Sequence, residues 1–192
     1  DWQSLQPPYA QLPQGRQRQQ ALDEIKRFHD HTDRFVMANA CPRPWERYQF
    51  IRGSENSYLD IMMPESGTLD LLRLIHEFYM RELEFWVKTD VDGIKFMDDW
   101  GAQKQLLIPP RLWREYFKPL YKEYCDLAKA HGKWVFMHSD GYIQDIYADL
   151  IEAGVDALNS QLFCMDLAYL QQHARGRINF WGEIDRPPVL SP

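Results

Sequence analysis

The stretch GIKFMDDWGAQKQLLIPPRLWREYFKPLYKEYCDLAKAHGKWVFMHSDG (93–141) decides the fold. It begins and ends with short apolar runs of the kind that form strands buried on both faces. Between them, Pro109 and Pro110 open a helix predicted over 111–131, and Gly132 ends it in the C-cap role. A strand, a long helical crossover and a second strand form a right-handed βαβ unit with parallel strands.

The same alternation continues on both sides of this unit. Strands are predicted over 34–40, 93–101, 133–141, 156–161 and 177–185, and helices over 17–31, 68–89, 111–131, 142–153 and 165–174. A loop and a short helix that ends at Gly53 are expected over 41–56, and the Pro- and Gln-rich residues 1–16 are expected to be an extended lead-in. The pattern predicts one α/β domain over 1–192 with a parallel sheet.

Polar residues follow four of the five predicted strands. They are Asp98 and Asp99 with Trp100 and Gln103 beyond them, His138, Ser139 and Asp140, Asn159, Ser160 and Gln161, and Glu183 and Asp185. Because the carboxyl ends of parallel strands lie at one face, where active sites form, these side chains are expected to converge. Plainer explanations stay open. Asp99 and Asp185 can each cap a following helix, Asn159 can satisfy a turn, and His138 can be a core histidine.

Composition excludes several classes of function. The net charge is −6 with no basic run, which argues against nucleic acid as a partner. No run of about 18 apolar residues is present, so no membrane span is expected. Three scattered cysteines do not make a disulfide framework and fit a reducing, cytoplasmic compartment. The common nucleotide-binding and hydrolase motifs are missing from the sequence.

Five segments in order resemble the superfamily that contains uroporphyrinogen decarboxylase and the corrinoid-linked methyltransferases. They are the DDWGAQ strand end, the helix with LWREYFKPLYK, the HSDG strand end, LIEAGVDALNS and FWGEID, and WERYQFIRGSE (45–55) resembles an element upstream of them. The resemblance implies a (β/α)8 TIM barrel, of which this chain covers about five βα units. Family members are longer, so flanking barrel segments are expected on both sides.

The resemblance implies two chemistries. Corrinoid-linked methyltransferases hold zinc through His-x-Cys and a later Cys, and they work with a corrinoid protein. Here His138 matches the histidine, but Asp140 stands where the cysteine would be. A His/Asp pair can still bind zinc through nitrogen and oxygen, and Asp140 can instead be a metal-free acid/base or binding group. The decarboxylase works without metal or cofactor.

The first hypothesis is therefore methyl transfer from a partner corrinoid protein, with zinc at His138 and Asp140. The residues expected to act in catalysis are Asp98, Asp99, His138 and Asp140, and those expected to bind the small-molecule substrate are Trp100, Gln103, Asn159, Gln161 and Glu183. The methyltransferase-like branch is the closer of the two, because its HSxG strand end is present.

Two alternatives remain from the sequence. One is a metal-free decarboxylase of uroporphyrinogen or a related polycarboxylate, in which Asp98 stabilises a protonated pyrrole and Arg43, Arg47 or Arg52 pairs with substrate carboxylates. The other is a catalytically degenerate barrel that binds a ligand, with a cleft plugged by an aromatic residue such as Trp100 or Trp181.

Overall fold

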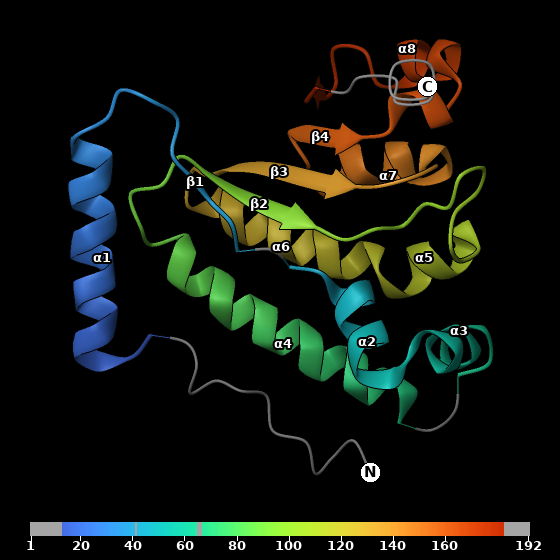
Figure 1. The fold of residues 1–192 in the computed structure, drawn as a ribbon, viewed down its shortest axis with the longest axis horizontal. Coiled ribbons are helices and arrows are strands. Elements are labelled where there is room, and N and C mark those ends of the chain that lie inside the picture. Colours follow the sequence, from blue (N-terminus) through green and yellow to red (C-terminus); the bar gives the residue numbers. More distant parts are fainter. Residues whose placement is uncertain (1–12, 41, 65–66, 183–192) are drawn as a thin grey trace, which may run out of the picture.

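The computed structural model describes residues 13–40, 42–64 and 67–182 and shows five parallel strands alternating with helices (Figure 1). The strands are β1 (Met37–Ala38), β2 (Gly93–Met97), β3 (Trp134–Ser139), β4 (Ala157–Ser160) and β5 (Asn179–Phe180). The helices are α1 (Gly15–Asp30), α2 (Pro44–Arg52), α3 (Ser54–Met62), α4 (Thr68–Trp86), α5 (Pro110–Tyr116), α6 (Lys118–Ala130), α7 (Gln144–Ala153) and α8 (Leu167–His173), with a 3-10 turn, η3, at Leu162–Cys164. None of the helices within the described ranges combines the length and hydropathy that crossing a membrane requires.

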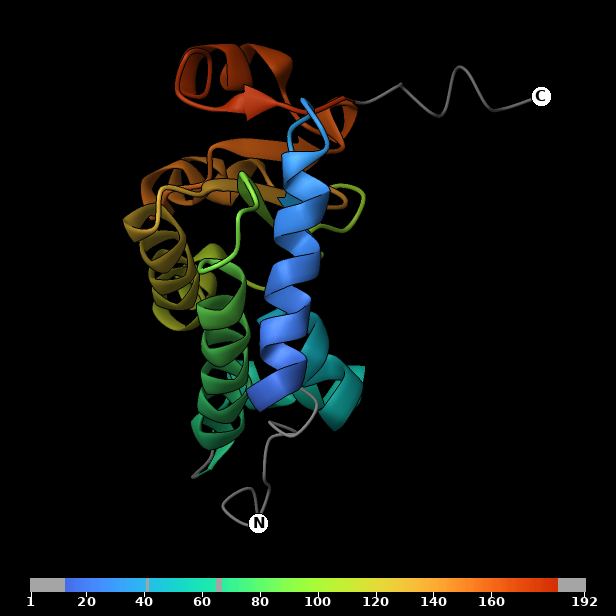
Figure 2. The same ribbon diagram turned by 90° about the vertical axis from the view of Figure 1, so that its left-hand side faces the viewer.

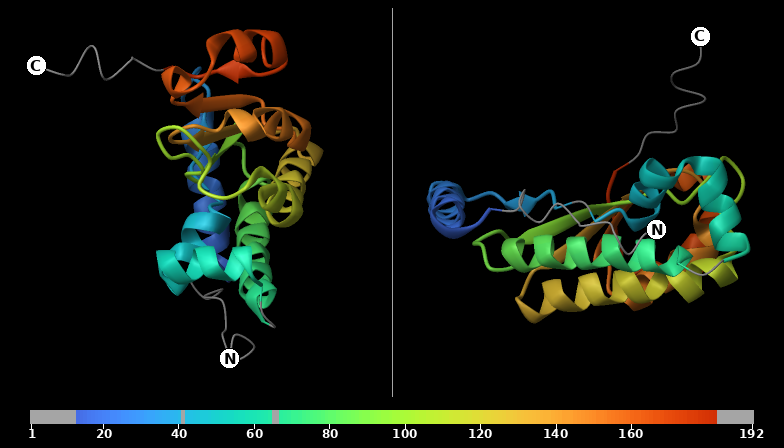
Figure 3. Two further views of the ribbon diagram at one scale, coloured as in Figure 1. Left: turned by 90° about the vertical axis from the view of Figure 1, so that its right-hand side faces the viewer. Right: turned by 90° about the horizontal axis from the view of Figure 1, so that it is seen from below.

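The strand order β1-β2-β3-β4-β5 follows the chain, and each strand is parallel to the next. This is the order of consecutive strands in a (β/α)8 barrel. Five strands do not close such a barrel, so the predicted partial TIM barrel is confirmed. Helices α4 and α6 run along one side of the sheet (Figures 2 and 3). Helix α1 lies beyond the amino ends of the strands, where Arg18 packs over the Phe85 ring of α4.

The strand register separates two faces of the sheet. Paired residues of parallel strands point to the same side, and successive residues alternate between sides. Phe96, Met137 and Leu158 are in register and fully or almost fully buried, as expected for the helix-covered face. His138 and Asn159 pair with each other on the opposite face, which is the interior face of the barrel. The register therefore places His138 and Asn159 side by side at the carboxyl end of the sheet.

An aromatic cluster packs under the end of β2. Trp100 is fully buried, stacks on Trp45 of α2 at a centroid distance of 5.6 Å, and meets Phe117 edge-on at 4.6 Å. Its indole nitrogen donates a hydrogen bond to the Tyr121 hydroxyl at 2.8 Å. Burying such large rings dominates local stability, so this cluster fixes α2, α5 and α6 against the strand end.

The single helix predicted over 111–131 was wrong, because two helices, α5 and α6, meet at Phe117. Pro119 explains the break. It has no N–H to donate to the carbonyl of Glu115, and its ring crowds that carbonyl. Gly53 does end α2, with φ of 81°, as predicted, but a further helix, α3, follows at once and was not predicted.

Other boundaries moved by a few residues. Helix α1 begins at Gly15, so the end of the predicted extended lead-in is helical. The ladder of β1 is confined to Met37 and Ala38, and that of β5 to Asn179 and Phe180. Cys41 lies outside the described residues, as do 1–12 and 183–185 of the predicted lead-in and fifth strand.

Candidate functional site

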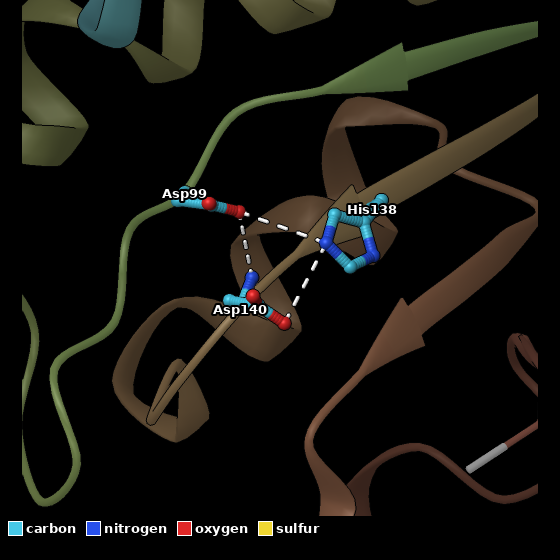
Figure 4. Close-up of side chains that lie close together, drawn as sticks. All are labelled: Asp99, His138 and Asp140. Carbon is cyan, nitrogen blue, oxygen red and sulfur yellow. Dashed lines mark hydrogen bonds and ion pairs between the residues drawn. The ribbon is translucent and has the colours of Figure 1, made fainter.

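Three side chains converge where β2 and β3 end (Figure 4). Asp99 follows β2, His138 is near the end of β3, and Asp140 follows β3. His138 Nε2 lies 3.7 Å from Asp99 Oδ1 and 3.6 Å from Asp140 Oδ1. The three potential ligand atoms all lie within 4.8 Å of one another, and the side chains are partly exposed. The sequence prediction that these residues converge is met for this group.

These spacings fit a metal ion better than direct hydrogen bonds. N–H···O hydrogen bonds span about 2.7–3.2 Å, which is shorter than either contact of His138 Nε2. A tetrahedral ion bound at about 2.0–2.2 Å holds its ligand atoms roughly 3.3–3.6 Å apart. One imidazole and two carboxylates are ligands that zinc accepts, and three protein ligands leave one position open, as in catalytic zinc sites. The donor set therefore fits the metal that the sequence suggested.

Two glycines bring the strand-end loops together. The Gly101 N–H donates to the Asp140 carbonyl at 3.1 Å, and the Tyr142 N–H donates to the Ala102 carbonyl at 2.8 Å. A Cβ on Gly141, whose φ is +76°, would lie 2.2 Å from the Gly101 oxygen, and one on Gly101 would lie 2.4 Å from the Gly141 carbonyl carbon. Only residues without a side chain permit this backbone contact, which sets Asp99 opposite Asp140.

Backbone and amide groups hold the two carboxylates. The Asp140 N–H donates to Asp99 Oδ1 at 2.9 Å, and Gln161 Nε2 donates to Asp140 Oδ1 at 3.0 Å. Gln161 Oε1 accepts from the Gly141 N–H at 3.2 Å. Gln103 lies farther out, with Nε2 3.6 Å from the sulfur of the partly exposed Cys164. Of the predicted substrate-binding residues, Gln161 thus contacts Asp140 directly, and Asn159 contacts His138.

Asp98 lies apart from this cluster in the core. Its side chain is fully buried and accepts hydrogen bonds from the backbone N–H of Trp45 and of Glu46, both at 2.9 Å, and from the Tyr121 hydroxyl at 2.6 Å. Burial raises the pKa of Asp98 to about 8. The two backbone donors belong to the first turn of α2, so Asp98 satisfies groups that the helix itself leaves unpaired. These contacts assign Asp98 to holding α2 against β2, whereas its predicted catalytic role stays a prediction.

Trp100 and Asn159 were also predicted to bind substrate. Trp100 has no exposed surface in the structure, so its side chain supports the strand end from within the core. Asn159 contacts His138, with its Oδ1 2.5 Å from His138 Nδ1, and its amide nitrogen reaches the chain after β5. Glu183 lies outside the described residues.

Glu46 is a neighbour of the site that the sequence did not single out. It is in the first turn of α2, and Asp98 holds its backbone at the end of β2. Burial raises the pKa of Glu46, the charge of Asp99 raises it further, and Arg43 and His138 oppose the shift. Its Oε2 is buried without a hydrogen-bond partner among the described residues. Glu46 lies in WERYQFIRGSE (45–55), which resembles an element of the family, but no pattern in the sequence places α2 beside β2.

Comparisons with known proteins agree with this architecture. The sequence model described as "Uroporphyrinogen decarboxylase (URO-D)" matches residues 3–191. Among solved structures, 14 chains match, including a methyltransferase from Methanosarcina mazei with a TM-score of 0.71 and 17% sequence identity. That match covers the whole of this chain and 56% of the methyltransferase chain. No curated protein sequence matches the chain.

Proposed function

The chain belongs to the uroporphyrinogen decarboxylase family, and on that premise we propose that it forms the metal-binding part of a methyltransferase. The observation that carries this proposal is the grouping of Asp99, His138 and Asp140, with Nε2–O spacings close to those around a tetrahedral ion. The structural likeness to a methyltransferase supports the fold at 17% identity, and the reaction is our proposal. The chain spans 56% of that protein.

His138, Asp99 and Asp140 would hold the metal, with zinc as the first candidate, and Gln161 would orient Asp140 through their hydrogen bond. When bound, zinc supplies Lewis acidity that lowers the pKa of a thiol acceptor and keeps it as the nucleophilic thiolate. The methyl donor in this proposal is a corrinoid protein that docks over the mouth of the barrel. Partial exposure of the three side chains is consistent with access from that side.

The decarboxylase alternative finds less support among the described residues. It needs arginines that converge on the cleft to bind substrate carboxylates. Arg52 instead binds Asp60 through two hydrogen bonds, at 2.6 and 3.1 Å, and so joins α2 to α3. Arg47 donates to the Tyr79 hydroxyl at 3.3 Å. Trp100 gives no support to the degenerate-barrel alternative, because it lies in the core. Trp181 packs edge-on against Phe136 at a centroid distance of 5.7 Å, on the His138 face of the sheet, and is consistent with that alternative.

Metal content of the purified protein tests the proposal. We expect about one zinc ion per chain by elemental analysis, and loss of that zinc in His138→Ala, Asp99→Ala and Asp140→Ala. His131→Ala and Asp126→Ala, which change exposed side chains elsewhere, are matched controls that should keep the metal. A folded wild type that takes up no zinc on reconstitution, or a His138→Ala variant that keeps it, would rule out the proposed site.

The reaction needs its own assay. Wild type supplied with a methylated corrinoid protein and a thiol should form the thioether, and the three ligand variants should not. Zinc binding without any methyl transfer to the thiols tested would keep the metal site and overturn the proposed acceptor.

A further inference from the structure

We propose that Asn159 is a positioning residue that fixes the tautomer of His138, with the proton on Nδ1 and the lone pair of Nε2 directed at the two carboxylates. The inference deepens the proposed function, since a metal at His138 requires that lone pair. The tautomer is also a property of the metal-free chain and can be measured there.

The orientation of the Asn159 amide follows from its surroundings. Its Nδ2 lies 2.5 Å from the Trp181 carbonyl and 2.9 Å from the Gly182 carbonyl. Carbonyl oxygens only accept hydrogen bonds, so the amide nitrogen must face them and donate to both. The opposite end of the amide, Oδ1, then faces His138 Nδ1 at 2.5 Å.

That orientation decides the role of His138 Nδ1. An amide oxygen has no proton to give, so His138 Nδ1 must be the donor in this contact. A neutral imidazole carries one proton, which leaves the lone pair on Nε2. That nitrogen lies between the carboxylates of Asp99 and Asp140, at distances longer than a hydrogen bond. Neither distance is short enough for an Nε2–H hydrogen bond, which is consistent with a lone pair on that nitrogen.

The competing state is a doubly protonated imidazolium held by the same two carboxylates. It would also donate from Nδ1 to Asn159, so the wild-type coordinates alone do not separate the two. The number of protons on the ring separates the two states, because the neutral tautomer has one protonated nitrogen and the imidazolium has two.

Two nearly isosteric substitutions separate the role of Asn159 at His138 from its role at β5. Asn159→Asp keeps an acceptor for Nδ1–H but loses the donors to Trp181 and Gly182. Asn159→Leu loses both. A role at the chain after β5 alone would leave the His138 ring unchanged in Asn159→Leu, because those contacts do not involve the ring.

The experiment is nitrogen-15 NMR of the histidine rings in metal-free protein at pH ~8, where a neutral imidazole is the ordinary form. The protein has 6 histidines, and the His138 signals are those missing from His138→Gln. We expect the Nδ1–H form in wild type and in Asn159→Asp, and the Nε2–H form or a mixture in Asn159→Leu. A wild-type ring protonated on Nε2 alone, or on both nitrogens, would overturn the proposal, as would an unchanged ring in folded Asn159→Leu.

Zinc affinity, measured by competition with a chelator, gives a second readout. Loss of a residue that orients a metal-binding histidine typically weakens affinity by about 10- to 100-fold, so we expect that loss in Asn159→Leu and a smaller one in Asn159→Asp. Equal losses in the two variants would contradict a positioning role. If wild type has the expected tautomer but binds no zinc, the proposed function fails while the role of Asn159 at His138 stands.

Discussion

Substitution of Asp98 tests whether this acid is structural, as its contacts indicate, or catalytic, as its place after β2 predicted. In Asp98→Ala, the N–H groups of Trp45 and Glu46 and the Tyr121 hydroxyl lose their acceptor. Each buried donor left unpaired costs about 1–3 kcal/mol, so three donors cost about 3–9 kcal/mol. Water that enters the vacated space keeps the loss towards the lower end of that range.

Such a loss is a large share of the about 5–15 kcal/mol by which a domain is usually stable. Urea unfolding followed by circular dichroism measures it. Asp99→Ala is a matched control one residue away, with a partly exposed side chain, and it should lose less than about 1 kcal/mol. An Asp98→Ala protein that is as stable as Asp99→Ala but inactive would refute the structural assignment and favour catalysis.

Two further predictions concern glycine and a half-buried acid, Glu82. Gly141→Ala should lose at least about 2 kcal/mol of unfolding free energy, because its φ is +76° and its Cβ would meet the Gly101 oxygen. Gly132→Ala, at φ +70° with open space around the new Cβ, should lose only about 1 kcal/mol, and equal urea midpoints for the two would contradict the steric reasoning. Burial raises the pKa of Glu82 to about 7, above its value in an unfolded chain, so the native state binds more protons and stability falls as pH rises from about 4.5 to 7. Glu82→Gln should flatten that part of the stability profile, and an unchanged slope would show that Glu82 does not cause it.

The sequence predicted much of the barrel, because the strand and helix signals are local. Apolar runs bounded by Gly and Pro located the five strands, and the long crossovers between them made the sheet parallel. The prediction of one helix over 111–131 was wrong. It followed a run of helix-forming residues and did not allow for the break that Pro119 causes in the turn before it. The unpredicted α3 has little apolar periodicity of its own.

For the candidate site, the sequence by itself determined which residues stand at the carboxyl ends of β2, β3 and β4, since parallel strands bring those ends to one edge. The sequence alone therefore predicted that Asp99, His138 and Asp140 lie close together. The sequence did not distinguish the role of Asp98 from that of Asp99. Both follow β2, and the alternation of side chains between the two faces of the sheet does not show which groups each face contacts.

Only the tertiary structure decided that distinction. Helix α2 comes from about 50 residues earlier in the chain and presents its unpaired N–H groups to Asp98, which takes that acid into the core. The register of β3 and β4 likewise made Asn159 the partner of His138. Both contacts depend on how distant segments pack and align, which no local pattern in the sequence encodes.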